Sequence, residues 1–168
     1  MPSVYLTHAA RRKVRRLAAL RAIIRRAKAR HQRVVFTNGC FDLLHPGHVA
    51  LLEQAKRAGD VLVLAINSDR SVRALKKGPG RPIVNQRDRA TVLAGLDSVD
   101  YITIFHEPTP ARIIAALRPN VLVKGADWKA SDIVGRDVVE RFGGRVLRIP
   151  LQKGYSTSQL VQRIKQRG

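Results

Sequence analysis

The sequence predicts an α/β domain built on a five-stranded parallel sheet and preceded by a basic helix. Short β-branched runs alternate with segments of helical periodicity, and no internal repeat interrupts this alternation. A chain of 168 residues can bury a core of its own, so one globular domain is expected. Parallel strands joined by helical crossovers that cover both faces of a sheet give a doubly wound, Rossmann-like fold.

Each strand is expected at an apolar run, and each helix at a segment with a period near 3.6. The predicted strands are residues 33–38, 61–67, 101–105, 121–124 and 145–150. The predicted helices are residues 47–58, 85–96, 109–117, 133–141 and 157–167, each about the length that a crossover requires. Residues 33–168 are therefore assigned to the domain, and residues 1–32 to an N-terminal arm.

The arm, together with Arg33 directly after it, holds more than half of the excess positive charge. The formal net charge is +20, and the first 33 residues contain eleven Lys and Arg but no Asp or Glu. Val14, Leu17, Leu20 and Ile24 recur at helical spacing, which predicts one amphipathic helix over residues 7–30 with an arginine-rich outer face. The favoured interpretation is a solvated helix that docks on the domain through its apolar stripe. The alternative is a surface for RNA or anionic lipid, whose binding high salt would weaken.

The rest of the composition indicates a protein of the cytoplasm. The longest apolar runs are far shorter than the roughly 20 residues that cross a bilayer, and the first 30 residues contain no signal-like apolar segment. Cys40 is the only cysteine, so an internal disulfide is excluded. We therefore expect a cytoplasmic protein without integral membrane contact.

Ligands of open α/β sheets bind beyond the carboxyl ends of the strands, near the point where the strand order reverses. Unusual polar residues follow three of the predicted strands, in residues 37–48, 124–128 and 154–158. We expect these three loops to converge on one site. A fourth segment, residues 76–82, combines glycines and prolines with two lysines and an arginine, which predicts a mobile loop that closes over phosphates.

The first loop contains His45-Pro46-Gly47-His48 at the start of a predicted helix. Two histidines three residues apart lie on one helix face, Pro46 suits the first helical turn, and Gly47 lets a ligand approach the backbone. The unpaired amides and the positive dipole end of a helix start favour an anion, to which two imidazoles can donate further hydrogen bonds. The motif therefore predicts a phosphate cradle, and its alternative is a pair of ordinary surface or capping histidines.

The sequence lacks the motifs of three other kinds of site. No third His or Cys stands at a ligand spacing that would complete a protein-held zinc site. No Gly-x-Gly-x-x-Gly and no Gly-Lys-Ser/Thr follows the first predicted strand. Dinucleotide-dependent and P-loop enzymes are therefore disfavoured.

Residues 37–48 resemble the signature of the cytidylyltransferase-like nucleotidylyltransferases, and among these they are most similar to the adenylyltransferase domain of bacterial ADP-heptose synthase. The resemblance covers about residues 33–165. Further matches follow in the family's order: Asn67-Ser68-Asp69, Arg81-Pro82, Arg89 before Ala94-Gly95-Leu96, Val99-Asp100, residues 122–127 and Ser156-Thr157-Ser158.

The resemblance implies an enzyme that transfers the adenylyl group of ATP to D-glycero-β-D-manno-heptose 1-phosphate. The products would be pyrophosphate and ADP-heptose, which serves lipopolysaccharide core synthesis. A homodimer or higher homo-oligomer is expected, with Mg²⁺ carried by ATP and no metal held by the protein alone. The sequence contains no fused sugar-kinase domain, so a stand-alone enzyme is expected whose substrate a separate kinase supplies.

Residues in the loops after the last two predicted strands favour ATP and heptose over the substrates of related enzymes. The glycerol-phosphate, choline-phosphate and ethanolamine-phosphate cytidylyltransferases typically carry an arginine where this chain has Leu151, and they lack the Lys124-Gly125 pair. The chain departs from the heptose pattern at Tyr155, where a small residue is usual, and at Ser158, which replaces a second threonine. Two alternatives stay open: a cytidylyltransferase for glycerol phosphate or a similar alcohol phosphate, and an RNA- or membrane-surface-binding protein with a degenerate nucleotide fold.

The implied reaction needs alignment and charge neutralisation, because its phosphate nucleophile is already anionic. The predicted catalytic residues are His45 and His48, for the α- and β-phosphate oxygens, and Lys76 or Lys77, for the reacting phosphates. Nucleotide contacts are expected from Thr37, Asn38, Gly39, Cys40, Phe41, Gly47, Arg89, Lys124, Gly125, Ser156, Thr157 and Ser158. Substrate contacts are expected from Asp42, Asp69, Arg81, Asp127 and Trp128, with Asp42 also the candidate to orient Mg²⁺.

Some of these residues have a structural interpretation as well. Asp69 could cap a helix, Arg89 could be a solvated helix cation, and Trp128 could belong to the core or a lid. Lys124 ends a predicted buried strand, where a lysine needs an anionic partner, and a bound phosphate would provide one.

Overall fold

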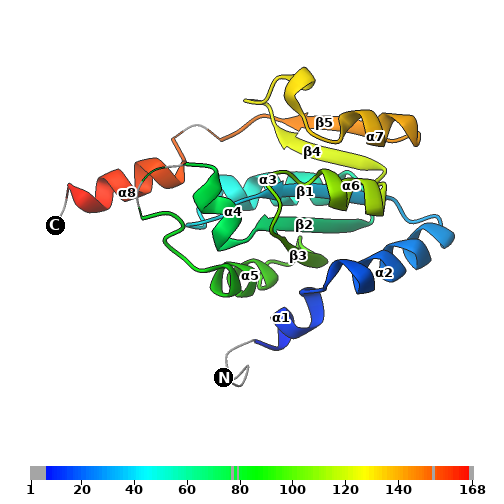
Figure 1. The fold of residues 1–168 in the computed structure, drawn as a ribbon, viewed down its shortest axis with the longest axis horizontal. Helices are drawn as coiled ribbons and strands as arrows, with labels where there is room; N and C mark the ends of the chain where they lie inside the picture. Colours follow the sequence, from blue (N-terminus) through cyan, green and yellow to red (C-terminus); the bar gives the residue numbers. More distant parts are fainter. Residues whose placement is uncertain (1–6, 77, 79, 153, 167–168) are drawn as a thin grey trace.

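The computed structural model describes residues 7–76, 78, 80–152 and 154–166 of the chain. Its centre is a five-stranded sheet in the order β3-β2-β1-β4-β5, in which every neighbouring pair is parallel (Figure 1). The strands are β1 (Val34–Gly39), β2 (Val61–Asn67), β3 (Tyr101–Phe105), β4 (Val121–Gly125) and β5 (Arg145–Ile149). The predicted doubly wound α/β fold is confirmed, and the strand order reverses between β1 and β4.

The burial of the strands explains why their sequences lack polar alternation. All seven residues of β2 are buried, as are the first four of β1. A strand that is covered on both faces reads as a continuous apolar run. The edge strand β5 is exposed at Arg145 and Arg148 and buried only at Ile149, as expected where one side of the strand has no neighbour.

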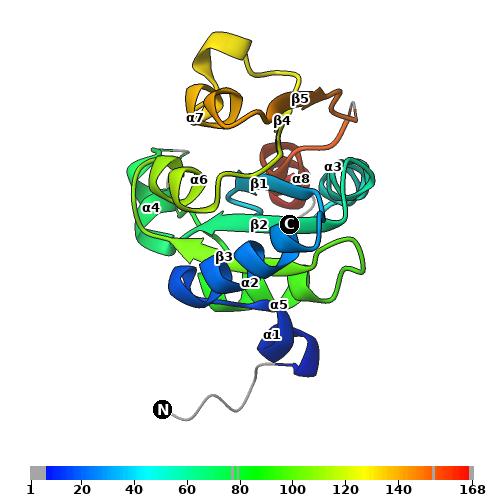
Figure 2. The same ribbon diagram turned by 90° about the vertical axis from the view of Figure 1, so that its right-hand side faces the viewer.

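Helices cover both faces of the sheet, and each face has its own core (Figure 2). One core joins Val35, Leu62 and Leu64 to helices α3 (Pro46–Arg57) and α5 (Gln86–Ala94). The other core joins the alternate residues of the same strands to helices α6 (Ala111–Leu117) and α7 (Arg136–Arg141). The period-2 alternation of side chains thus feeds two layers of helices.

The remaining short elements lie in loops at the carboxyl edge of the sheet. Helix α4 (Asp69–Ala74), which the sequence did not predict, has only six residues and begins after Ser68, whose side chain accepts a hydrogen bond from the amide of Ser71. A 3-10 turn spans Ala130–Asp132, and helix α8 (Thr157–Lys165) ends the described chain. The helix predicted at residues 133–141 begins only at α7, because Gly135 with φ of 85° separates it from the preceding turn.

The arm forms two helices, so the prediction of a single helix over residues 7–30 is wrong. Helix α1 (His8–Lys13) stops at Val14, whose extended backbone forms a parallel bridge to Ile102 of the edge strand β3. Helix α2 (Leu17–Ala29) then continues on the other face of the sheet. The apolar residues with helical spacing therefore serve two different cores, and the chain must leave the helix in order to pass around the sheet edge.

Both arm helices are docked through apolar side chains, as the favoured interpretation expected. Ala10 of α1 is fully buried against the core that contains α5. Leu20, Ile24 and Ala27 of α2 are buried in the core that contains α6. Within the described residues, no helix combines the length and the apolar character that crossing a membrane requires.

Candidate active site

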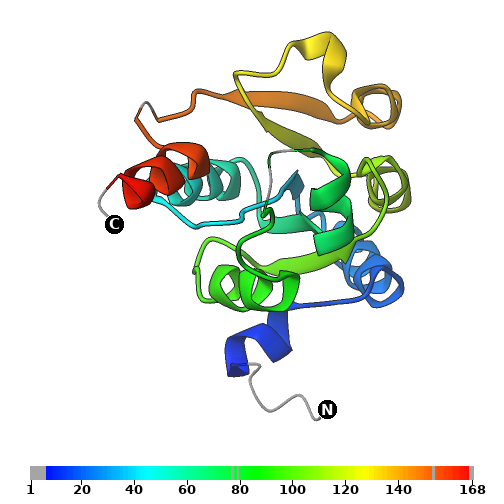
Figure 3. The ribbon, with the colours of Figure 1, turned by 60° about the vertical axis from the view of Figure 1, so that its left-hand side comes forward.

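The candidate active site is a pocket of about 880 Å³ at the carboxyl edge of the sheet, where the strand order reverses. Figure 3 turns this edge forward, with α3 and α8 beside it. The three polar loops of the sequence line this one pocket. The predicted site residues in its lining are Thr37, Asn38, Gly39, Cys40, Phe41, Asp42, His45, Gly47, His48, Arg81, Lys124, Gly125, Asp127, Trp128, Ser156, Thr157 and Ser158.

The two histidines form a stacked pair at the start of α3. His45 is the N-cap residue in an extended conformation, and Pro46 begins the helix because its missing N–H is not needed there. The imidazole rings of His45 and His48 lie 3.7 Å apart between centroids and only 17° from parallel. Both histidines line the pocket together with Gly47, while the amides of His48 and Val49 donate to the carbonyl of His45, so the imidazole rings and the Gly47 amide are the groups here that could meet an anion.

Burial sets the protonation state of His45. Its ring atom Nδ1 is enclosed and has no hydrogen-bond partner within the described part of the chain. Desolvation lowers the pKa of His45, and a hydrogen bond involving its own backbone opposes this shift only in part. The ring is therefore neutral at neutral pH, and a neutral imidazole still donates one N–H to a phosphate oxygen.

Phe41 fixes the loop that leads from β1 to the histidines. Its backbone lies in the left-handed region, with φ of 48°, and its ring centroid is 4.7 Å from that of His48. A Cβ on Gly39 would lie 2.9 Å from the same ring, so only glycine leaves room for it. The strained backbone at Phe41 and the absence of a side chain at Gly39 together hold the phenyl ring beside the imidazole pair.

Lys124 joins the two strands at the point where their order reverses. It is buried at the end of β4, and its Nζ donates to Oδ1 of Asn38 in β1 at 2.5 Å. The same ammonium group lies 5.3 Å from the centre of the Trp128 ring, within cation–π range. The pocket thus contains a buried cation that contacts Asn38 and the Trp128 ring.

Two glycines let the loops close around the pocket. A Cβ on Gly125 would lie 2.3 Å from Oδ1 of Asp127 and 3.0 Å from Leu151, so this strand end admits no larger residue. A Cβ on Gly47 would lie 3.2 Å from the His45 ring and from Cβ of Tyr155. The close approach at Gly47 brings the third loop against the histidine motif, and the one at Gly125 brings Leu151 against the end of β4.

The third loop contributes the aromatic side chain of Tyr155 to the pocket. In the sequence, this residue stands out only as a departure from the family pattern. The ring of Tyr155 lies nearly parallel to that of His45, with 6.4 Å between centroids and 21° between planes. The next residue, Ser156, caps α8 by accepting a hydrogen bond from the amide of Gln159 at 3.1 Å. Tyr155 thus forms the outer wall of the pocket at the histidine pair.

Arg89 and Asp69, for which ligand contacts were expected, are not among the residues that line the pocket. The Arg89 side chain has no exposed surface, and its guanidinium donates to the carbonyls of Cys40 (2.6 Å) and Val84 (2.9 Å). It also pairs with Oδ1 of Asp69 at 2.7 Å. A buried guanidinium requires such partners, so Arg89 fastens the loop behind the site, and a contact of Arg89 with the nucleotide stays a prediction.

Asp42 lines the pocket, but its carboxylate is already engaged. Oδ1 accepts hydrogen bonds from the amides of Ile83 (2.8 Å) and Val84 (2.9 Å), and Oδ2 lies 3.2 Å from Nε of Arg81. These three neighbours come from residues 81–84, where the 76–82 loop ends and leads to α5. No group of three or more His, Cys, Asp or Glu side chains suited to a metal exists among the described residues, and a role of Asp42 in orienting Mg²⁺ stays a prediction.

Arg81 and the lysines of the same loop are placed differently. Nη1 of Arg81 is buried in the pocket wall and has no hydrogen-bond partner in the described structure, so it can donate to an anionic oxygen. Lys76 is exposed, has φ of 48° and is not among the lining residues. Lys77 lies outside the described residues. A catalytic role for either lysine stays a prediction.

Sequence reasoning missed the wall of the pocket formed by β2, β3 and α4. This wall includes Asn67, Val72, Leu75, Phe105 and residues 108–110. Asn67 ends β2 next to the loop that follows β1, where its Oδ1 lies 3.7 Å from Sγ of Cys40, and its amide nitrogen donates to Oγ of Ser71 at 2.9 Å. The polar end of β2 was the available signal, since parallel strands place their carboxyl ends on one edge.

The sequence and the fold match known proteins. A family model described as "Cytidylyltransferase-like" matches residues 36–163. The chain is 52% identical over 152 residues to the "Bifunctional protein HldE" of Geobacter metallireducens, an alignment that covers 90% of this chain and 31% of that protein. The "Bifunctional protein HldE" of Magnetococcus marinus is 52% identical over 141 residues, or 84% of this chain and 29% of that protein. The chain thus spans less than a third of the length of these relatives.

Solved structures share the fold. A lipopolysaccharide core biosynthesis protein from Thermoplasma volcanium superposes with a TM-score of 0.60 at 26% identity, over 74% of this chain and 99% of that chain. A pantoate-beta-alanine ligase from Francisella tularensis has the same TM-score at 15% identity, over 91% of this chain and 77% of that chain, and therefore shows the fold alone. With the family model matching most of its length, the chain belongs to the cytidylyltransferase-like family.

Proposed function

We propose that the chain is a nucleotidyltransferase that transfers the adenylyl group of ATP to heptose 1-phosphate. A phosphate oxygen of the sugar attacks the α-phosphorus of ATP, the bond from that phosphorus to the bridging oxygen breaks, and pyrophosphate leaves. The main support for this proposal is the stacked His45–His48 pair at the start of α3, which lies in one pocket with the buried cation of Lys124. The resemblance to the adenylyltransferase domain of ADP-heptose synthase and the relatives of about 50% identity support this choice of reaction.

The histidine pair would stabilise the charge that grows on the phosphate oxygens. His45 is neutral, so its ring donates a hydrogen bond without adding charge, and the amide of Gly47 in the first turn of α3 would supply a further donor. Such fixed donors stabilise the transition state because they need no reorientation as the bond breaks. His48 stacks on His45 and would serve the neighbouring phosphate oxygen.

Two cations would hold the triphosphate and the sugar phosphate in line. Lys124 reaches the pocket from the centre of the sheet, and Nη1 of Arg81 reaches it from the opposite loop. Asp42 would act as a positioning residue for Arg81, because their 3.2 Å ion pair orients the guanidinium. Lys76 or Lys77 would add a further cation when the loop closes.

ATP is proposed as the nucleotide, with Mg²⁺ arriving bound to its phosphates. Leu151 lies against the end of β4, where the related cytidylyltransferases typically carry an arginine. The wall at this place is therefore apolar, which suits an adenine ring. We also propose that the enzyme works in the cytoplasm as a homodimer or higher homo-oligomer, which size-exclusion chromatography with light scattering would test.

The proposed activity is tested by measuring pyrophosphate release over a matrix of substrates. ATP and CTP are each combined with heptose 1-phosphate, glycerol 3-phosphate and choline phosphate in the presence of Mg²⁺. We expect release only with ATP and heptose 1-phosphate. Release with CTP and glycerol phosphate would replace the proposal by the cytidylyltransferase alternative, and no release in any combination would refute both.

A further inference from the structure

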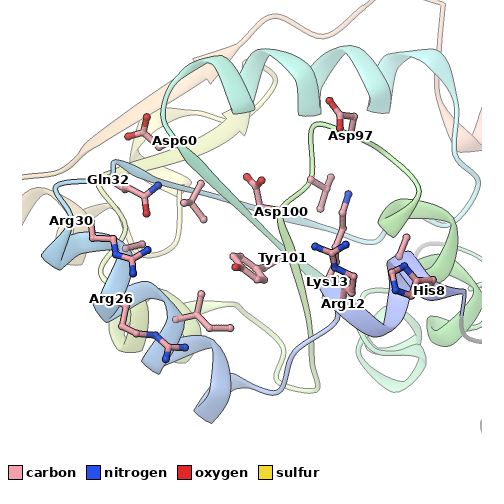
Figure 4. Close-up of a pocket in the computed structure, with 15 residues that line it drawn as sticks. His8, Arg12, Lys13, Arg26, Arg30, Gln32, Asp60, Asp97, Asp100 and Tyr101 are labelled. Carbon is pink, nitrogen blue, oxygen red and sulfur yellow. The ribbon is translucent and has the colours of Figure 1, made fainter.

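A second pocket of about 810 Å³ lies at the opposite edge of the sheet, between the arm and the amino ends of β2 and β3. Figure 4 shows the side chains that line it. Its wall includes the first residues of these strands, Val61 and Tyr101, whereas the active-site pocket contains their last residues, Asn67 and Phe105. The two pockets therefore occupy opposite ends of the same strands and share no lining residue.

Cations from both arm helices line this arm pocket. Arg12 and Lys13 belong to α1, and Arg26 belongs to α2, which Arg30 directly follows. In Figure 4 these two pairs lie on either side of the Tyr101 ring. Lys13 donates to the carbonyl of Leu96 at 2.7 Å. The three guanidinium groups are exposed, and no carboxylate of the described residues lies within ion-pair distance of them.

Carboxylates form another part of the same wall and are held apart from these cations. Oδ2 of Asp60 accepts a hydrogen bond from the amide of Arg33, and Oδ2 of Asp100 accepts one from the amide of Leu62, each at 2.6 Å. Asp100 also pairs with Lys56 at 2.6 Å. These backbone contacts fasten the carboxylates to the strand starts, so the guanidinium groups of the arm remain open to a ligand.

We propose that the arm pocket binds a phosphorylated polyhydroxyl compound, such as a sugar phosphate. The phosphate would lie between Arg12 and Arg26 or Arg30, because guanidinium groups bind phosphate oxygens in bidentate pairs. Hydroxyl groups would donate to the carboxylates of Asp97 and Asp100. The ring of Tyr101 would pack against the carbon atoms of the ligand. The volume is that of a typical small-molecule site.

The same charges disfavour a nucleic-acid strand in this pocket. A strand presents a phosphate at every nucleotide, and its path along the pocket would bring phosphates against Asp60, Asp97 and Asp100. A ligand with one phosphate and several hydroxyl groups can place its phosphate at the arginines and its hydroxyl groups at the carboxylates. This proposal does not depend on the reaction at the other edge of the sheet.

Glucose 6-phosphate, glucose and inorganic phosphate serve as probes in a titration of the full chain followed by amide chemical shifts. We expect glucose 6-phosphate to shift amides of residues 8–13 and 97–101 and to bind more tightly than either other probe. Shifts confined to residues 37–48 would place all phosphate binding in the active site and overturn the proposal. This readout separates the two pockets whether or not the chain has adenylyltransferase activity.

Variants test each part of the arm pocket. The double substitution R12A/R26A should weaken glucose 6-phosphate binding at residues 97–101 by about tenfold or more, since each guanidinium makes charge-assisted hydrogen bonds. The matched control R21A/R25A removes two exposed arginines of α2 that do not line the pocket and should change affinity less than twofold. Equal weakening by both double variants would overturn the proposal.

Asp97 distinguishes a sugar phosphate from phosphate alone. The substitution Asp97→Ala should weaken glucose 6-phosphate binding several-fold but leave inorganic phosphate binding unchanged or stronger, because it removes both a hydroxyl acceptor and a negative charge. Stronger binding of both probes would show that the carboxylate only repels, and would overturn the hydroxyl part of the proposal. Tighter binding of poly(U) than of glucose 6-phosphate, weakened as much by R21A/R25A as by R12A/R26A, would identify a nucleic-acid surface instead.

Discussion

The two edges of the sheet hold their charged groups in different ways. At the carboxyl edge, Lys124 is buried and bonded to Asn38, and the carboxylate of Asp42 accepts two backbone amides. At the amino edge, Arg12 and Arg26 stand on exposed helix faces, although the helices themselves are packed on the core. A site that must stabilise a transition state needs groups that are already in position. A site that only binds can order flexible side chains when the ligand arrives.

The largest expected effect tests whether the arm is part of the domain. Leu20 of α2 is fully buried, so Leu20→Ala should lower the free energy of unfolding by about 3 kcal/mol through lost burial and the cavity left behind. Urea unfolding followed by circular dichroism measures this change. The control Arg21→Ala, on the exposed face of the same helix, should change it by less than about 0.5 kcal/mol.

An unchanged unfolding free energy in Leu20→Ala would mean that the arm is not packed as described.

The same packing determines how nucleic-acid or lipid binding by the arm should be tested. Removing residues 1–30 would take Leu20, Ile24 and Ala27 out of the core, so loss of binding could follow from loss of fold. Charge substitutions on the exposed face avoid this problem.

The second effect concerns catalysis at the carboxyl edge. His48→Ala should lower kcat by about 100-fold, as expected for the loss of one fixed donor to a developing negative charge. Pyrophosphate release measures it, and the melting temperature should stay close to that of the parent chain. His106→Ala, which removes an exposed histidine outside the pocket, provides the control. Turnover equal in both variants would remove His48 from the catalytic machinery.

Ligand binding at the arm pocket, measured in the same variants, tests whether the two edges of the sheet work independently. His48→Ala should leave the shifts that glucose 6-phosphate causes at residues 97–101 unchanged, because the two pockets share no lining residue. R12A/R26A should show the reverse behaviour, with turnover retained at saturating substrate. Loss of both properties in either variant would contradict the independence of the two edges.

A smaller effect is expected at Tyr155. The ring stacks on His45, so Tyr155→Ala should reduce kcat/KM several-fold, in line with about 1 kcal/mol for an aromatic contact. Tyr155→Phe keeps the ring and should behave like the parent chain. If the phenylalanine variant were as impaired as the alanine variant, the hydroxyl rather than the ring would be the functional group.

The smallest effect is a pH dependence of stability that belongs to His45. Burial lowers its pKa in the folded chain below the ordinary value of about 6.5, so the unfolded chain binds the proton more tightly. The stability that neutral His45 confers is therefore complete above pH 6.5 and is lost as the pH falls through the folded pKa. His45→Gln should have a shallower decline of unfolding free energy between pH 7 and pH 5. Parallel curves for the two chains would contradict a lowered pKa.

The sequence by itself determined the fold class, the five strands and the convergence of the three polar loops. These features depend on local patterns: continuous apolar runs for buried strands, helical spacing between them, and a His-Pro-Gly-His start at α3. The helix predicted at residues 47–58 has the observed length, whereas the other four predicted helices were two or three residues too long. Their ends depend on capping groups such as Asn85, whose side chain accepts hydrogen bonds from the amides of Arg87 and Asp88 before α5.

Only the tertiary structure decided which polar residues face the pocket. Arg89 and Asp69 carry the charges that a phosphate or sugar site uses, but contacts with Cys40 and Asp69, which lie 49 and 20 residues away in the sequence, turn Arg89 into the interior. The break between α1 and α2 likewise depends on the pairing of Val14 with Ile102 at the sheet edge. Local spacing cannot reveal such contacts, because they form between segments that only the fold brings together.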